Sequence, residues 1–395
     1  MICIPPGTLV SGGYRVLRRL PVAADAFEVS HDAHPGQRLM LRLPCYNARL
    51  LGGPPPLDRF EWPDSGGKEA LVFPLQGVVL AELVAPLPAP ELARLWRMLR
   101  FCNERDAAED FSLDAGLHRL PGAIQHDYPA PPFRHLLRRL LGPGLRGDRS
   151  WTLRELLEEG LQAPATRHDV GGVLSATGTV RAQVELLWGE REDALMLCVY
   201  EAVDVYQQGV PAREATLTAL SLSFALGAEL PELLSAATDA YVAATRESQA
   251  RIGYEGGLGC CLVAVIHPER VELAWVGDSR AYLCRAGALR LLTRDHTLRQ
   301  AALEAGAANP FADTRILTRG LLIEGAEWER AELTPEPGDR LLLCSHGVCD
   351  CLDDAQIAAT LGQHHANAAA LAALHVQALN AAKDDHLAAI LFRVP

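Results

Sequence analysis

The sequence predicts an α+β protein built from two units. Its 395 residues are enough for two domains that each bury a hydrophobic core. Short apolar runs separated by Gly, Pro and Asp turns recur near both ends of the chain, which is typical of antiparallel strands. Two stretches with helical spacing, 211–227 and 231–249, lie between strand-like runs. We therefore expect one unit at residues 1–163 and a second at 169–395.

The composition predicts a soluble, mildly acidic protein. Hydrophobic residues make up 49% of the chain, charged residues 22%, and the net charge is -12. No basic stripe stands out against this acidic balance, so we expect no nucleic-acid partner. No apolar run approaches the roughly 20 residues of a membrane span. The first residues lack a basic region followed by an apolar core, so we expect a cytoplasmic protein without a membrane partner.

Three alternating runs open the first unit, at 14–20, 26–32 and 38–44. Turn residues separate them, which predicts a small antiparallel meander. These runs resemble the first three strands of bacterial serine/threonine protein kinases. Further helical runs, at 133–141 and 150–157, resemble the last helices of a kinase C-lobe.

The residues that would bind nucleotide differ from the kinase pattern. Kinases need glycines between the first two strands, because the backbone there approaches the phosphates closely. Here Pro21, Ala23 and Ala26 stand at those places, and Arg42 replaces the lysine of the third strand. We expect a shortened, inactive kinase-like module, with an unrelated α+β regulatory domain as the alternative.

The second unit contains three motifs at the ends of predicted strands. An apolar run at 271–276 enters a Gly-Asp-Ser turn and a second run leaves it, which predicts a β-hairpin. Gly277 can adopt positive φ in that turn. Pro-Gly-Asp-Arg begins at Pro337 and leads into the apolar run 341–344. Lys-Asp-Asp-His precedes a last strand at 388–394.

Together these motifs resemble the metal-dependent (PPM, type 2C) serine/threonine protein phosphatases. The resemblance implies an α/β/β/α sandwich, in which two antiparallel sheets pack face to face and helices cover each sheet. It also implies that Arg181 binds the substrate phosphate, since the planar guanidinium offers paired donors to phosphate oxygens. A solvated surface arginine is the alternative for Arg181.

The positions that the resemblance assigns to metal ligands are altered. Leu186 replaces an acidic residue, Glu201 replaces the aspartate that bridges two metals, and Ala202 replaces a glycine. His346 replaces a further aspartate, whereas Asp384 is retained. Two divalent cations need several hard oxygen ligands, so we expect no two-metal site and no cofactor.

A single-metal site is the alternative. Glu201, His346 and Asp384 could together hold one manganese, zinc or iron ion. Asp204 and Asp385 are alternates, because the alignment with the family pattern shifts by a residue at these places. If no metal binds, Glu201 and His346 are expected to hydrogen-bond to each other or to Arg181.

These observations favour a pseudophosphatase that binds protein partners or phosphoproteins in bacterial-type serine/threonine phosphosignalling. One alternative is an active phosphatase, a phosphoric monoester hydrolase, with the single-metal site. Another is a pure scaffold. The chain also has ten cysteines, including a C-x-C pair at Cys349 and Cys351 close to Cys344. A zinc site needs more ligands at standard spacing, so we expect these cysteines to serve packing.

Overall fold

A computed structural model shows how the two predicted units are built. It describes residues 4–20, 26–43, 56–63, 69–75, 78–79, 111–113, 117–119, 168–175, 182–203, 210–252, 258–306, 316–322, 324–381 and 386–395. Among these residues, no helix combines the length and apolarity that crossing a membrane requires.

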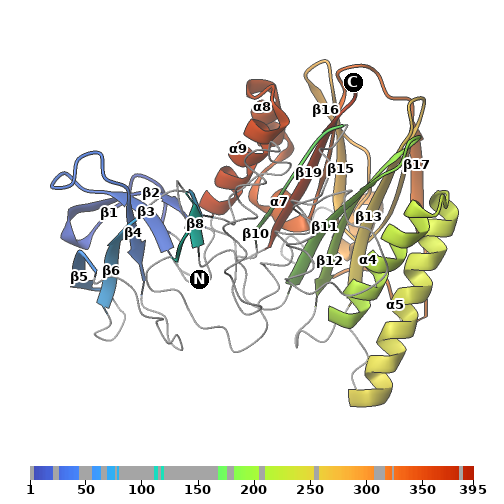
Figure 1. Cartoon of the computed structure of the whole chain (residues 1–395), viewed down its shortest axis with the longest axis horizontal. Helices are drawn as coiled ribbons and strands as arrows, with labels where there is room; N and C mark the ends of the chain where they lie inside the picture. Colours follow the sequence, from blue (N-terminus) through green and yellow to red (C-terminus); the bar gives the residue numbers. More distant parts are fainter. Residues whose placement is uncertain are drawn as a thin grey trace.

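Two five-stranded antiparallel sheets form the C-terminal part (Figure 1). Sheet I contains, in spatial order, β10 (Asp169–Ser175), β19 (Leu387–Arg393), β18 (Arg340–Cys344), β15 (Arg280–Arg285) and β16 (Ala288–Leu291). Sheet II contains β11 (Ala182–Glu190), β12 (Leu195–Val203), β13 (Leu258–Ile266), β14 (Val271–Val276) and β17 (Glu329–Leu333).

Helices cover the outer face of each sheet (Figure 1). Sheet II packs against α4 (Val210–Ala225) and α5 (Leu230–Ile252), close to the helices that the periodicity predicts. Sheet I packs against α7 (His346–Cys351), α8 (Asp354–Gln363) and α9 (Asn367–Asn380). The predicted α/β/β/α sandwich is therefore confirmed.

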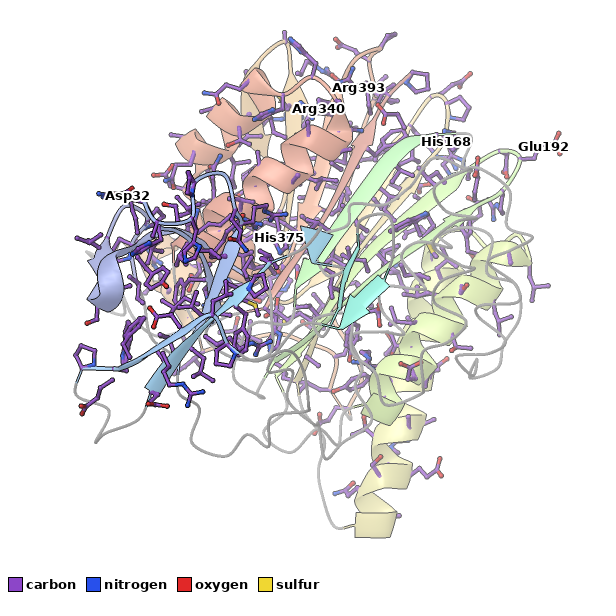
Figure 2. The ribbon with its side chains drawn as sticks, turned by 60° about the vertical axis from the view of Figure 1, so that its left-hand side comes forward. Asp32, His168, Glu192, Arg340, His375 and Arg393 are labelled. Atoms are coloured by element: carbon purple, nitrogen blue, oxygen red, sulfur yellow. The ribbon has the colours of Figure 1, made fainter. Side chains whose placement is uncertain are left out.

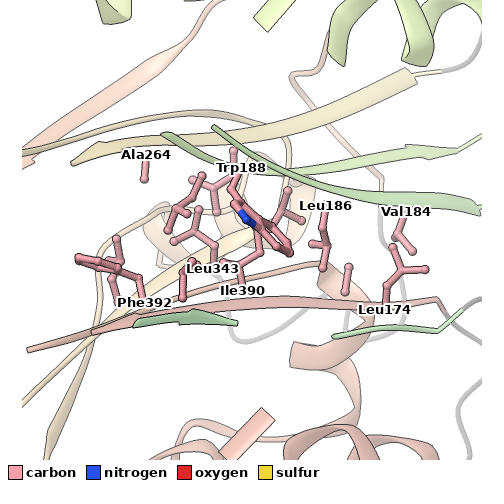
Figure 3. Packing of buried hydrophobic residues seen from close by; sticks show 14 of the residues in the cluster. Leu174, Val184, Leu186, Trp188, Ala264, Leu343, Ile390 and Phe392 are labelled. Atoms are coloured by element: carbon pink, nitrogen blue, oxygen red, sulfur yellow. The ribbon is translucent and has the colours of Figure 1, made fainter. Parts of the chain in front are cut away.

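The two sheets bury a common apolar core between them. Figure 3 shows Trp188 and Leu186 of sheet II facing Leu343 and Ile390 of sheet I. All four side chains are nearly inaccessible to water. Burying each large apolar side chain stabilises the fold by roughly 1.5–3 kcal/mol relative to exposing it, so this layer fixes how the sheets face each other.

The predicted hairpin at the Gly-Asp-Ser turn was wrong. β14 lies in sheet II and β15 lies in sheet I, so the turn carries the chain from one sheet to the other. Gly277 has the predicted positive φ, at 102°. A hairpin and a crossing between sheets both require two apolar runs joined by a turn. The sequence pattern cannot distinguish them, because it does not specify which strand each run pairs with. The next turn does form a hairpin, between β15 and β16.

The N-terminal part contains a six-stranded antiparallel sheet. Its strands lie in the order β1 (Leu9–Val10), β2 (Tyr14–Arg19), β3 (Ala26–Ser30), β4 (Leu39–Arg42), β6 (Glu69–Pro74) and β5 (Asp58–Glu61). The predicted meander of three runs is confirmed by β2, β3 and β4. The runs predicted to resemble kinase C-lobe helices, at 133–141 and 150–157, lie outside the described residues. The kinase-like module stays a prediction.

The N-terminal sheet shares buried side chains with the sandwich. Met40 of β4 and Phe73 of β6 belong to the same apolar cluster as Val170 and Leu174 of β10. The backbone N–H of Arg19 donates to the Asn380 side chain at 3.2 Å. Figure 2 brings this boundary forward, with His375 labelled on α9. The two parts therefore pack against each other through apolar contacts and through α9.

Candidate functional site

The candidate site lies at the end of the sandwich where strands of both sheets stop. Glu201, near the end of β12, lies on the same side of the strand as Val199, which faces the core between the sheets. Cys260 is its direct partner on β13. The Glu201 side chain is buried, at 6% exposure. A buried carboxylate needs compensating donors, so its partners define the site.

His346 supplies one such donor from sheet I. β18 ends at Cys344, and α7 begins at His346. The backbone N–H of His346 donates to Glu201 Oε2 at 3.2 Å. Ser345 ties the same turn to the last strand, because its hydroxyl donates to the His386 carbonyl and accepts from the Ala388 N–H. The contact between Glu201 and His346 thus links the ends of the two sheets.

The imidazole of His346 lies between two carboxylates. Its Nδ1 is 3.3 Å from Asp278 Oδ2, in the turn that connects the sheets. Its Nε2 is 2.9 Å from Asp350 Oδ1, one helical turn further along α7. The His346 side chain is only 13% exposed. Both ring nitrogens therefore already face carboxyl groups of the protein.

Asp278 is a buried carboxyl group with a perturbed pKa. Burial raises the pKa of Asp278, whereas the charge of His346 acts in the opposite direction. The nearby charge of Asp295 raises it further. The thiol of Cys260 donates to Asp278 Oδ1 at 3.4 Å. The carboxyl group is thereby held between a thiol and an imidazole.

Arg280 forms an ion pair with Asp295 beside the site. Its guanidinium donates two hydrogen bonds to Asp295, at 2.9 and 2.6 Å. The hydrogen bond to Asp295 raises the pKa of Arg280 above its already high ordinary value. A third nitrogen donates to the Tyr282 hydroxyl at 3.3 Å. This geometry agrees with a structural role for the arginine of the Gly-Asp-Ser-Arg motif.

Two thiols flank the turn that carries His346. The sulfur atoms of Cys344 and Cys349 are 3.5 Å apart. Their mutual hydrogen bond, together with burial, raises the pKa of Cys344. The same hydrogen bond and the charge of Arg280 lower the pKa of Cys349. The Tyr282 hydroxyl lies 3.7 Å from the Cys349 sulfur.

The structure brings together two of the six predicted site residues, Glu201 and His346. The others, Arg181, Asp204, Asp384 and Asp385, lie outside the described residues. Sequence reasoning did not assign Asp278, Asp350 or Cys260 to the site. Asp350 could have been found from its i,i+4 spacing to His346 on a short helix. Asp278 and Cys260 could not, because their positions depend on the crossing between sheets.

A different group of metal-capable side chains lies at the opposite end of sheet II. Within the described part of the chain, Glu229, His267 and Glu272 offer three ligand atoms within 4.8 Å of one another. The Arg270 guanidinium already lies among them, 3.1 Å from Glu272 and 3.4 Å from Glu229. The positive guanidinium therefore already neutralises the carboxylates that a metal ion would bind. We interpret the group as an ion-pair network that closes the turn between β13 and β14.

The chain is similar to known bacterial phosphatases. Residues 190–302 match the family model "Protein phosphatase 2C". The serine/threonine protein phosphatase PstP of Mycobacterium tuberculosis is 34% identical over 107 residues, which are 26% of this chain and 21% of PstP. The match thus spans about a fifth of that relative.

Solved structures give the fold. Serine/threonine phosphatase Stp1 from Staphylococcus aureus has a TM-score of 0.52 at 20% identity, covering 58% of this chain and 96% of Stp1. The catalytic domain of PstP, solved in complex with two manganese ions, has a TM-score of 0.49 at 24% identity, covering 57% of this chain and 96% of that domain. The C-terminal part therefore has the fold of bacterial serine/threonine phosphatases, with a protein phosphatase 2C match at residues 190–302.

Proposed function

We propose that the chain is a pseudophosphatase of the type 2C fold, which binds phosphorylated protein segments without hydrolysing them. The observation that supports this most directly is the position of His346. The phosphatase resemblance implies a metal-binding aspartate at this position. Here an imidazole lies between Asp278 and Asp350 instead.

A two-metal centre fits these residues poorly. Two adjacent divalent cations need several carboxylate oxygens to neutralise them. Replacing aspartate with histidine removes one negative charge, and Leu186 is buried in the apolar core where the resemblance implies an acid. One Glu201 oxygen accepts from the His346 N–H, so that group already has a partner without a metal. Hydrolysis through a metal pair is therefore not part of the proposed function.

Phosphate binding would depend on the chain's own cations. Arg181 is the residue that we propose to bind the phosphate, because a guanidinium forms paired, charge-assisted hydrogen bonds with phosphate oxygens. Arg280 is unsuited to this role, because two nitrogens of its guanidinium already donate hydrogen bonds to Asp295. A bound phosphoserine or phosphothreonine would stay intact, because no metal-activated water would be available to attack it.

The second candidate is a phosphatase with one metal, held by Glu201, His346 and Asp384. The hydrogen bond from the His346 backbone to the Glu201 carboxylate favours it, because it brings the two residues to the same end of the sandwich. Histidine and carboxylate ligands together suit manganese, zinc or iron. This site would require the imidazole to release Asp278 or Asp350. Manganese is the first metal to test, because the PstP catalytic domain was solved with two manganese ions.

Phosphopeptide binding tests the proposed function. A fluorescent phosphothreonine peptide should bind, whereas the unphosphorylated peptide should not. Arg181→Ala should weaken binding about tenfold or more, since hydrogen bonds to charged groups contribute about 1.5–3 kcal/mol. Arg181→Lys is the matched control, which keeps the charge but loses the planar fork. Equal binding of both peptides, unchanged in Arg181→Ala, would contradict phosphate recognition and favour a scaffold.

A further inference from the structure

Cys344 and Cys349 form a thiol pair that the proposed function does not use. Cys344 is the last residue of β18, and Cys349 lies within α7. The segment between them is the turn that carries His346. Their sulfur atoms are 3.5 Å apart, although a disulfide needs about 2 Å. A displacement of about 1.5 Å would therefore join them.

The two thiols differ in exposure. Cys344 is fully buried, whereas Cys349 is partly exposed. Of the two residues, Cys349 is therefore the one nearer to solvent and the first that a small oxidant would meet. A thiol closer to solvent, next to a second thiol that can resolve its oxidised form, is typical of redox-sensitive cysteines.

The groups around Cys349 favour its reaction as a nucleophile. The Tyr282 hydroxyl lies 3.7 Å from its sulfur, and Arg280 donates to that hydroxyl at 3.3 Å. A positive guanidinium so close to a thiol favours the reactive thiolate. The Cys344 thiol is also held in place, because it donates to the Arg280 carbonyl at 3.7 Å.

A second thiol pair in the same sandwich provides an internal comparison. The sulfur atoms of Cys198 and Cys261 are 3.7 Å apart, a separation close to that of the first pair. Both side chains are 0% exposed between sheet II and its helices. The sulfur–sulfur distances are therefore similar in the Cys198–Cys261 and Cys344–Cys349 pairs. The pairs differ in solvent exposure, because only the second includes a partly exposed residue.

We propose that Cys344 and Cys349 are a peroxide-oxidisable dithiol whose disulfide closes the turn carrying His346. The Cys349 thiolate attacks hydrogen peroxide, the O–O bond breaks, and hydroxide leaves as Cys349 becomes a sulfenic acid. The Cys344 thiol then loses its proton as its sulfur attacks the Cys349 sulfur, the S–S bond forms, and the S–O bond breaks with loss of a second hydroxide. The two thiol protons convert both hydroxides to water. Two electrons pass from the thiols to one peroxide.

The disulfide would act on the candidate site through the backbone. The turn between the cysteines holds the His346 N–H against Glu201 and the imidazole against Asp350. Drawing the sulfurs together would move the first turn of α7 toward the end of β18, and so would shift His346 relative to sheet II. The dithiol would thus couple the oxidation state of the protein to the geometry around His346, whether or not the site binds phosphate.

The test is oxidation of the full chain with a small excess of hydrogen peroxide. Remaining thiols are blocked with N-ethylmaleimide under denaturing conditions, and the digest is mapped by mass spectrometry without reduction. We expect a Cys344–Cys349 cross-link that dithiothreitol reverses, while Cys198 and Cys261 are recovered as alkylated thiols. Cys349→Ser should abolish the cross-link. Cys351→Ser is the matched control and should retain it.

Three results would overturn the proposal. The first is recovery of Cys344 as an alkylated thiol after Cys349 has been oxidised. The second is a Cys349–Cys351 cross-link in place of the predicted one. The third is equal cross-linking of the buried Cys198–Cys261 pair, which would show that access does not select the site. If circular dichroism shows that Cys349→Ser does not fold, Cys344→Ser is used in its place and should also abolish the cross-link.

Discussion

Gly277 illustrates how one residue decides the connection between the sheets. Its φ is 102°, and a Cβ at this position would overlap the Cys260 sulfur and lie 3.0 Å from the Cys260 Cα. Backbone strain and a steric clash therefore act together. We expect Gly277→Ala to lower the free energy of unfolding by about 2–4 kcal/mol in urea titrations.

Gly287→Ala is the matched control for this prediction. Gly287 also has positive φ, at 81°, but a Cβ added there would have no atom within 4 Å. Only the backbone strain remains at this position, which costs about 1–2 kcal/mol. Equal losses in the two variants would show that the contact with Cys260 is not important.

For single residues, the sequence predicts which side chains lie at the candidate site better than it predicts the side chains that they contact. Glu201 and His346 could be predicted, because Glu201 lies near the end of β12 and His346 just after β18, and both strands are apolar runs that match the family pattern. The role of Asp278 could not, because the Gly-Asp-Ser pattern indicates only a turn-forming residue within one hairpin. Its contact with His346 exists only because the turn crosses between the sheets.

At the scale of elements, Glu28 ties two neighbouring segments of the N-terminal sheet together. Its carboxylate accepts from Arg18 at 2.7 Å and from Arg38 at 2.6 Å. Burial raises the pKa of Glu28, but the hydrogen bonds and charges of Arg38 and Arg18 outweigh it and lower the pKa below its ordinary value of 4.5. Two charge-assisted partners thus stabilise the ionised form in the folded state.

The sign of the pH dependence follows from this lowered pKa. The stabilisation is present above the pKa of the unfolded state and is lost as pH falls through the folded-state pKa. Urea titrations between pH 6 and pH 3, about the range over which carboxyl groups titrate, should show stability falling more steeply in the wild type than in Glu28→Gln. Glu69→Gln is the control, because the Arg59–Glu69 pair is exposed and contributes little. If the free energy of unfolding fell equally with pH in the wild type and in Glu28→Gln, the result would contradict the expectation.

The elements themselves were predicted well where periodicity is strong. α4, α5 and the strands β14, β18 and β19 lie close to their predicted ranges. Thr297 caps α6 (Leu298–Glu304) by accepting from the Gln300 N–H. Sheet membership was not predictable in the same way. β14 and β15 each have buried apolar residues on both faces, so their sequences do not indicate which sheet each one joins.

At the scale of the whole molecule, the shared core makes the N-terminal sheet part of the same folded body as the sandwich. Met40 is fully buried in the cluster that includes β10. Met40→Ala should lower the free energy of unfolding by about 2–5 kcal/mol and should separate the unfolding of the two parts in calorimetry. Leu39→Ala, equally buried but in the separate core of the N-terminal sheet, is the control. A single transition retained in Met40→Ala would show that the boundary does not depend on this contact.

The chemistry at His346 decides between a binding protein and an enzyme, and phosphate release tests it most directly. Purified full-length protein is incubated with a phosphothreonine peptide and saturating manganese, and then with zinc or iron. We predict no phosphate release above the heat-denatured control for any of the three metals. Turnover by the wild type that His346→Ala abolishes would contradict this prediction, and would identify the chain as an active phosphatase with a histidine at its metal centre.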